Sequence, residues 1–220
     1  MEGGAGVDLC DSGATTHSGG SWGGQGIIAT FSPPGGLFRV DPEGGSKSQL
    51  TAPDKEFGEL RHSFPQILPG GRAVLFTVIK TGQNIFDLAG IEAISLANRP
   101  RKTVLSGAWF ARYAPTGQLV FIKGDTPYAV AFDLDRLETR GTPVSLLQPF
   151  YQPRTASVPV DFSTLAPEEG MALYRTGGGS EIGTLQSIEL FRQHEAGFAQ
   201  AGRISQPALF AGRATDRVDP

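Results

Sequence analysis

The chain has 220 residues and is rich in turn-forming residues, with 30 glycines and 16 prolines, a composition typical of short strands joined by many turns. Its formal net charge of −3 gives no reason to expect nucleic acid or an anionic membrane as a partner. Cys10 is the only cysteine, which excludes an intrachain disulfide and a cysteine-based zinc site.

The first residues lack the basic and apolar regions of a signal peptide. No apolar run approaches the length of a transmembrane helix, so we expect no membrane segment in this chain. A single thiol does not identify a compartment, and the localisation stays open. Residues 1–17 are predicted to be a lead segment or an outer strand around residues 7–10.

From residue 18 onward one phrase recurs four times: an aromatic residue, a turn that contains glycine, and an apolar run. The aromatic residues are Trp22, Phe64, Tyr113 and Phe162. The last glycines of the four turns, Gly26, Gly71, Gly117 and Gly170, are spaced by 45, 46 and 53 residues. Strands and turns that repeat with a period in the forties are typical of a β-propeller, in which each repeat forms one blade.

Alternating or β-branched runs between Gly, Pro and Asp residues predict the strands of each repeat. In chain order they are residues 27–31, 37–40, 48–51, 73–78, 91–96, 102–105, 119–122, 128–132, 144–147, 171–174 and 187–191. The last run also has a helical spacing, and we favour a strand because the repeat requires one. We therefore predict an all-β fold, a β-propeller of about four blades of four antiparallel strands that forms a partial or open ring. The predicted blades are residues 18–62, 63–110, 111–159 and 160–204, followed by a frayed tail at 205–220.

Residues 62–76, 111–120 and 131–144 resemble WD40-like (TolB-type) propeller blades. The most similar group is the propeller that follows the kinase domain in bacterial receptor-like serine/threonine protein kinases. The resemblance extends over residues 18–147 and, more loosely, 160–191. It implies a repeat protein that binds a protein or peptide partner, or a small ligand at the central channel. In a receptor-like parent, the propeller would lie on the periplasmic or extracytoplasmic side of a membrane anchor.

This chain departs from that family in two respects. The family's turn usually carries Asp before Gly, and none of the four turns here does; the final glycine still permits the positive φ that the turn needs. Four blades are also fewer than the six to eight usual in the family. We therefore expect a fragment, or a ring completed by another polypeptide, as a homodimer or by pairing with the missing blades.

No catalytic, cofactor-binding or metal site emerges from the motifs. The Gly-rich loop, catalytic loop and Asp-Phe-Gly of a kinase are absent. The segment 18–23 leads into a predicted blade and not into the strand-to-helix turn of a hydrolase elbow, and residues 177–180 lack the lysine of a phosphate-binding loop. Asp133, Asp135 and Glu138 lack the spacing of a calcium loop and are predicted to form a turn between two strands, and residues 168–169 are predicted to form a solvated turn.

His17, His62 and His194 are the only histidines, and no two have a metal-binding spacing. We expect His62 to hydrogen-bond between neighbouring blades. Apart from Asp161, the inner-strand phrases carry no acid.

The aromatic residues fall into two groups. Those that recur in the repeat, Trp22, Phe64, Tyr113 and Phe162, are expected to pack between blades. Those that break the repeat are placed in loops beside blade junctions, where they serve as interface anchors or, as we favour, as buried packing residues. This second group comprises Phe57, Trp109, Phe110, Phe150 and Tyr151.

The sequence thus predicts a non-catalytic interaction or sensing module without cofactors, part of a larger kinase-type or TolB-type protein. Two alternatives stay open: a propeller-based hydrolase or peptidase-associated domain, and a truncated propeller without a function of its own.

Overall fold

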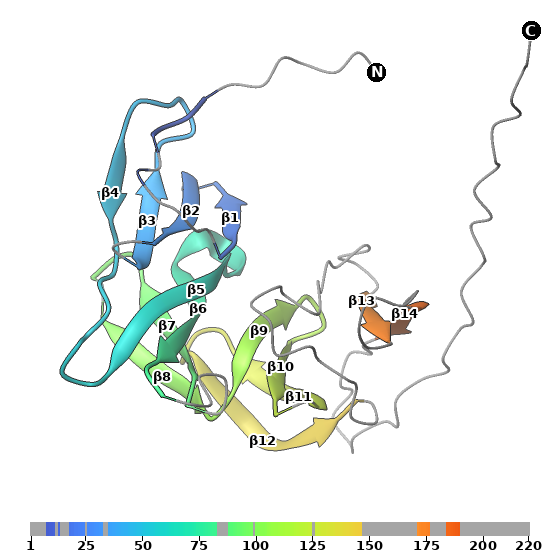
Figure 1. The fold of residues 1–220 in the computed structure, drawn as a ribbon. Helices are drawn as coiled ribbons and strands as arrows, with labels where there is room; N and C mark the ends of the chain where they lie inside the picture. The colour runs from blue at the N-terminus through green and yellow to red at the C-terminus, as the bar shows by residue number, and fades with distance from the viewer. Residues whose placement is uncertain are drawn as a thin grey trace, which may run out of the picture. The chain divides into compact units, whose positions relative to one another are not determined.

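The computed structural model describes residues 8–11, 13, 18–24, 26–32, 35–82, 88–98, 100–124, 126–146, 171–176 and 184–189. The chain divides into two compact units, residues 1–150 and residues 151–220 (Figure 1). Within the described ranges, no helix is long and apolar enough to cross a membrane.

The first unit contains three four-stranded antiparallel sheets, each with its strands in chain order. The first sheet consists of β1 (Gly20–Gly23), β2 (Gly26–Phe31), β3 (Gly36–Val40) and β4 (Lys47–Gln49). The second consists of β5 (Glu59–Ile67), β6 (Ala73–Lys80), β7 (Gly90–Ser95) and β8 (Arg101–Ser106). The third consists of β9 (Trp109–Ala114), β10 (Gln118–Lys123), β11 (Thr126–Asp133) and β12 (Glu138–Ser145).

These strands confirm the predicted all-β class and most of the predicted positions. The largest difference is at β12, which begins at Glu138, six residues before the predicted 144–147. Its residues are mostly exposed, so the strand has no apolar alternation from which it could be recognised. Trp109 and Phe110 were expected in a loop but belong to β9, and each is only 2% exposed. Their burial agrees with the favoured packing role.

The sheets pack face against face in a repeating manner. Strand β5 packs against β1, β2 and β3, and β9 packs against β5, β6 and β7, so the first strand of each sheet lies on the sheet before it (Figure 1). We call the side of a sheet that faces the preceding sheet its rear face, and the opposite side its front face. The apolar side chains between the first and second sheets include Ile28, Leu37, Val74 and Phe76.

The interface between the second and third sheets has the same construction. Leu75 and Ala93 from the second sheet pack with Leu119, Phe121 and other residues of the third. Because successive residues of a strand point to opposite faces, Val74 faces the first sheet and Leu75 faces the third. Each sheet of this unit therefore contributes one apolar face to each neighbour.

The register of the first strands shows which residues are equivalent in the repeat. Trp22 pairs with Ile27, Ile67 with Val74 and Tyr113 with Leu119. Tyr113 is 8% exposed and packs on the second sheet, as expected. The expectation for Trp22 is wrong: its side chain is 70% exposed, because no sheet of the described chain precedes the first sheet and packs on its rear face.

Phe64 is not the counterpart of Tyr113, since Ile67 holds that position. Phe64 and Phe110 instead lie at matching irregularities in β5 and β9, between Ser63 and Gln66 and opposite Val120 to Ile122. Both have positive φ, 55° and 49°, and their rings meet edge to face with centroids 5.0 Å apart. Phe64 therefore does pack between two sheets, although at a different place in the repeat.

The glycines that end the turns have the backbone conformation that the sequence predicts. Gly26, Gly71 and Gly117 have φ values of 106°, 66° and 90°, which are strained for residues with a side chain. Gly170 lies outside the described residues.

The N-terminal segment lies beside the first sheet. Residues 8–11 form no strand; the Leu9 carbonyl accepts a hydrogen bond from the Gly45 amide at 2.8 Å. Leu9 and Cys10 pack against Phe31, Phe38 and Val40 on the rear face of the first sheet.

In the second unit, β13 (Met171–Thr176) and β14 (Thr184–Glu189) form an antiparallel hairpin. A strand at 184–189 favours the strand interpretation of this region over the helical one. The rest of the predicted fourth blade and the tail at 205–220 lie outside the described residues.

Candidate functional site

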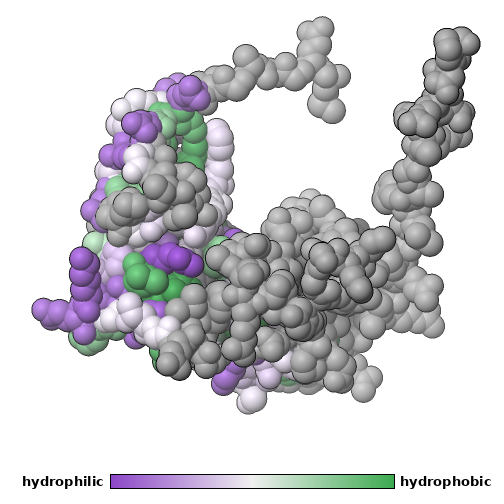
Figure 2. All heavy atoms as spheres, in the orientation of Figure 1, coloured by the Kyte–Doolittle hydropathy of each residue, from purple (hydrophilic) through white to green (hydrophobic). Residues whose placement is uncertain are grey.

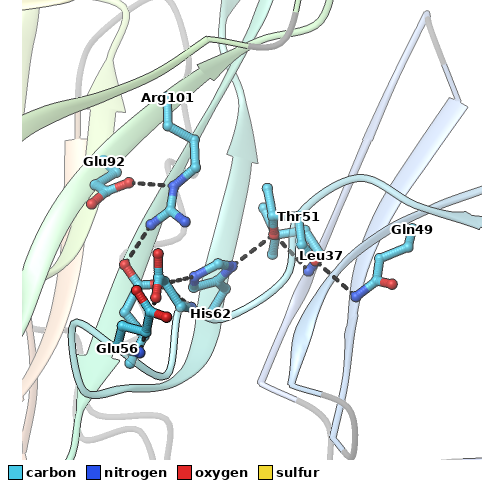
Figure 3. Close-up of polar contacts among 9 residues, drawn as sticks. Leu37, Gln49, Thr51, Glu56, His62, Glu92 and Arg101 are labelled. Atoms are coloured by element: carbon cyan, nitrogen blue, oxygen red, sulfur yellow. Dashed lines mark hydrogen bonds and ion pairs between the residues drawn. The ribbon is translucent and has the colours of Figure 1, made fainter.

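A buried polar network connects the first and second sheets (Figure 3). His62 lies in β5 and is 1% exposed. Its Nδ1 atom is 2.7 Å from the hydroxyl of Thr51, which follows β4 in the chain, and its Nε2 atom is 3.0 Å from Oε2 of Glu59. The prediction that His62 links neighbouring blades is confirmed.

The network determines which nitrogen of His62 carries the proton. The Glu59 carboxylate only accepts hydrogen bonds, so Nε2 donates to it and Nδ1 of the neutral ring accepts from the Thr51 hydroxyl. The same hydroxyl accepts a hydrogen bond from the Leu37 amide at 3.0 Å. Thr51 thus joins β3 of the first sheet to β5 of the second.

Glu59 is held on both carboxylate oxygens. Oε2 accepts from His62 and, at 2.8 Å, from the Asp54 amide, while Oε1 accepts from Nη2 of Arg101 at 2.6 Å. Arg101 also donates from Nε to Glu92 at 2.8 Å. The guanidinium therefore connects β5 to β7 and β8 with one charge shared between two carboxylates.

The surroundings shift the pKa values of this network. Burial alone would raise the pKa of Glu59, but hydrogen bonds from Arg101, the Asp54 amide and His62 outweigh it and lower that pKa. Burial lowers the pKa of His62, and the Glu59 hydrogen bond opposes this only in part. The pKa of Arg101 is raised because its two carboxylate partners outweigh its own burial. At neutral pH the network holds a neutral His62 and charged Glu59 and Arg101.

Phe76 forms the apolar base of the network. Its ring centroid lies 5.0 Å from that of His62 and 5.8 Å from the Arg101 guanidinium carbon, a distance suited to a cation–π contact. Each polar side-chain atom of His62 and Glu59 has a hydrogen-bond partner within the protein. The network therefore serves to hold the two sheets together.

A second set of polar contacts joins the first strands. Ser21 Oγ accepts from the Ile67 amide at 2.9 Å, and Gln66 Oε1 accepts from the Tyr113 amide at 2.6 Å. Ile67 and Tyr113 are equivalent in register, as are Ser21 and Gln66. In the first and second sheets, the residue just before Trp22 and the residue just before Ile67 therefore bond the backbone of the following sheet.

The predicted acidic turn is present. Asp133 ends β11, and its Oδ1 atom accepts from the amides of Asp135 and Arg136 at 2.9 and 3.0 Å. Asp133 also pairs with Arg140, and Glu138 pairs with Lys102. These carboxylates are engaged by the turn and by neighbouring basic residues, as expected for a structural turn. Across the described ranges, no group of three His, Cys, Asp or Glu residues is placed to hold a metal ion.

The favoured expectation that Phe57 is buried is wrong, because its side chain is 72% exposed. It lies in the turn before β5, and the Gly58 carbonyl of that turn accepts from the Thr81 amide at 2.8 Å. The Leu88 side chain, 50% exposed, approaches Gly82 beyond the end of β6. The end of the second sheet therefore presents two apolar side chains on adjacent loops, and Figure 2 shows apolar areas over the first and second sheets on its visible face.

The remaining predicted positions lie outside the described residues. They are His17, His194, Phe150, Tyr151, Asp161, Phe162, residues 168–169 and residues 177–180. Sequence reasoning found His62 but missed its partners, since Thr51, Glu59 and Arg101 occupy no motif. The only signal was Glu59 three residues before His62, which a regular strand would place on opposite faces; the irregular pairing after Glu59 brings the two side chains together.

No family model matches the chain, and no curated protein matches it. Several solved structures match the chain. Regucalcin from Agrobacterium tumefaciens strain C58, described as a calcium-binding protein, matches with a TM-score of 0.50 and 10% identity over 80% of this chain and 57% of its own.

Two further matches involve Nup159. A chain of the S. cerevisiae complex of Dbp5 with Nup159 and Gle1 matches at a TM-score of 0.46, with 11% identity over 79% of this chain and 44% of its own. The N-terminal domain of Nup159 matches at 0.44, with 11% identity over 80% and 45%. This chain therefore spans about half the length of the structures it matches. The regucalcin match and the repeated four-stranded sheets show a β-propeller fold.

Proposed function

We propose that this β-propeller module is non-catalytic and binds a protein or peptide segment through the loops at one end of its second sheet. The observation that carries the proposal is the pair of exposed apolar side chains, Phe57 and Leu88, on adjacent loops. Exposed apolar patches mark sites where proteins bind one another, and aromatic side chains such as that of Phe57 are enriched there. An extended peptide with apolar side chains is a partner of matching chemistry.

The polar network supports the non-catalytic part of the proposal. Thr51, His62 and Glu59 have the residue types of a nucleophile, a base and an acid. Thr51, however, is 6% exposed, and its oxygen already accepts from the Leu37 amide. A substrate would have to displace the contact between two sheets to reach it.

The resemblance of residues 62–76 and 111–120 to TolB-type blades supports a larger parent protein. We place the module in a TolB-type or serine/threonine kinase-type protein, where a propeller would present its loops to an incoming partner. The parent's phosphoryl transfer would require residues that this sequence lacks.

The test is a selection of displayed random peptides on the 220-residue chain, followed by calorimetric titration of a synthetic copy of an enriched peptide. We expect Phe57→Ser and Leu88→Ser to weaken that binding at least tenfold. Val144→Ser is the matched control, since Val144 is an exposed apolar residue on the third sheet, 41% exposed, and should bind like the unaltered chain. Failure to enrich any peptide, or equal binding by all variants, would overturn the proposal.

Two further experiments test the alternatives. A chromogenic ester panel compares the unaltered chain with His62→Gln, and we expect no turnover that the substitution abolishes. A calcium titration asks whether this chain shares the property for which regucalcin is described; we expect no binding heat. Turnover dependent on His62, or stoichiometric calcium binding, would replace the interaction module with an enzyme or a metal-binding propeller.

A further inference from the structure

The rear face of the first sheet is built like the surfaces that the other sheets bury. Its members are Trp22, Ile27, Ala29, Phe31, Phe38 and Val40. At the equivalent positions of the later sheets, Ile67 packs toward the first sheet and Tyr113 packs on the second. The two interfaces inside the molecule thus show what this kind of face packs against, which is the apolar face of another sheet.

This face is covered over only part of its area. Phe31, Phe38 and Val40 are 6%, 9% and 3% exposed beneath the N-terminal segment. Trp22 is 70% exposed, while Ile27 and Ala29 are half-buried. The open part is therefore a tryptophan flanked by aliphatic side chains, with no charged residue among the face's members.

Within the described residues, few apolar surfaces of a second copy are open to pack against this face. The front face of the first sheet is buried by the second sheet, and that of the second sheet by the third. On the front face of the third sheet, Val120 and Ile122 are already 2% and 0% exposed. A head-to-tail contact would need an open front face, so a second copy matches this rear face best with its own.

The border of the face carries charges of both signs. The exposed residues Asp8, Asp11 and Lys47 line a hollow together with Leu9, Cys10 and Gly45. The Lys47 ammonium donates to the Asp11 carbonyl at 2.6 Å and lies 5.0 Å from the centre of the Phe31 ring. Because this border holds a lysine as well as aspartates, two copies that meet through the face can pair unlike charges at its edge.

We propose that two copies of this chain associate through the rear faces of their first sheets, with Trp22 of each copy packed against the partner. The contact would involve the open part of the face around Trp22, where apolar side chains of two sheets can interdigitate. The small net charge of −3 opposes such association only weakly. This inference concerns a different surface from the peptide site proposed above, and either proposal can fail alone.

The experiment is sedimentation equilibrium of the 220-residue chain over a concentration series that reaches the millimolar range. We expect a reversible monomer–dimer equilibrium that weakens as salt is added. Trp22→Ser should raise the dimer dissociation constant at least tenfold and, as a change at an exposed position, leave the circular dichroism spectrum unchanged. Val144→Ser is the control, because it removes an exposed apolar side chain on the third sheet and should leave the equilibrium unaltered.

Tryptophan fluorescence supplies a second measurement. Trp22 and Trp109 are the only tryptophans, and Trp109 is 2% exposed. The difference in iodide quenching between the unaltered chain and Trp22→Phe therefore reports on Trp22, and we expect it to shrink as the dimer forms. A monomer at every concentration, a dimer insensitive to Trp22→Ser, or open-ended oligomers would each overturn the proposal.

Discussion

The Gln66 side chain bonds both backbone groups of Tyr113, a residue 47 positions later in the chain. Its Oε1 atom accepts from the Tyr113 amide at 2.6 Å, and its Nε2 atom donates to the Tyr113 carbonyl at 3.1 Å. At this position of the unpaired edge of β9, one amide side chain therefore makes the two backbone hydrogen bonds that a neighbouring strand would make. This arrangement orients the third sheet relative to the second more strictly than apolar packing alone, because hydrogen bonds are directional.

Gln66→Ala should reduce the free energy of unfolding by about 1–3 kcal/mol, since it leaves a partly buried amide and carbonyl without their partner. Urea denaturation followed by circular dichroism measures the change. Ser48→Ala removes a polar side chain at an exposed position of β4 and should change stability by less than about 0.5 kcal/mol. Equal effects of the two substitutions would contradict the role assigned to Gln66.

The neutral, buried His62 should make the protein sensitive to acid. Its pKa is lowered in the folded chain, so the unfolded chain binds the proton more readily. The stability contributed by neutral His62 is present above its ordinary value of 6.5 and is lost as the pH falls below it. The lowered pKa of Glu59 acts in the same direction, from its ordinary value of 4.5 downward.

The corresponding measurement is a set of urea denaturation curves between pH 8 and pH 5. One proton taken up on unfolding contributes a slope of at most about 1.4 kcal/mol per pH unit. His62→Gln should remove the part of the slope just below pH 6.5 while lowering stability at pH 8, where its amide replaces only some of the hydrogen bonds. An unchanged slope in this variant would show that His62 does not titrate with unfolding.

Gly36 should tolerate no side chain. A Cβ atom at this position would overlap the Thr51 carbonyl oxygen, and the Thr51 hydroxyl holds His62. Gly36→Ala should therefore cost about 1–3 kcal/mol or more and also displace the network. Gly24→Ala is the control, because a Cβ atom there meets nothing within 4 Å; similar melting temperatures for the two variants would refute this account.

The strands of the fold could be predicted because their apolar residues alternate, as in residues 91–96 and 128–132. The first strands were harder to predict. In β5 and β9 the irregularities at Phe64 and Phe110 break the alternation, and the aromatic phrase misaligned Phe64 with Tyr113 by three positions of register. A one-residue change of register exchanges the two faces of a strand, so the sequence alone could not assign these faces.

The polar network illustrates a different limit. Arg101 and Glu59 lie 42 residues apart, and nothing in their local sequence indicates that they meet. Their contact depends on the arrangement of the whole second sheet, in which β5 and β8 are the two edge strands, and this is a tertiary feature. The exposure of Trp22 was likewise unpredictable, because a recurrent aromatic residue is buried only where a neighbouring sheet covers it.

Leu137 offers a test of backbone strain in the turn between β11 and β12. It has a φ of 54° and packs against the core between the second and third sheets. Leu137→Ala removes this contact and keeps the strained backbone, whereas Leu137→Gly removes the contact and relieves the strain. The glycine variant should therefore be more stable than the alanine variant by about 1 kcal/mol, as measured by urea denaturation. At Thr139 in β12, where φ is not positive, the order should reverse, because glycine in a strand costs more conformational entropy than alanine. The same order at both positions would mean that the turn at Leu137 is not strained.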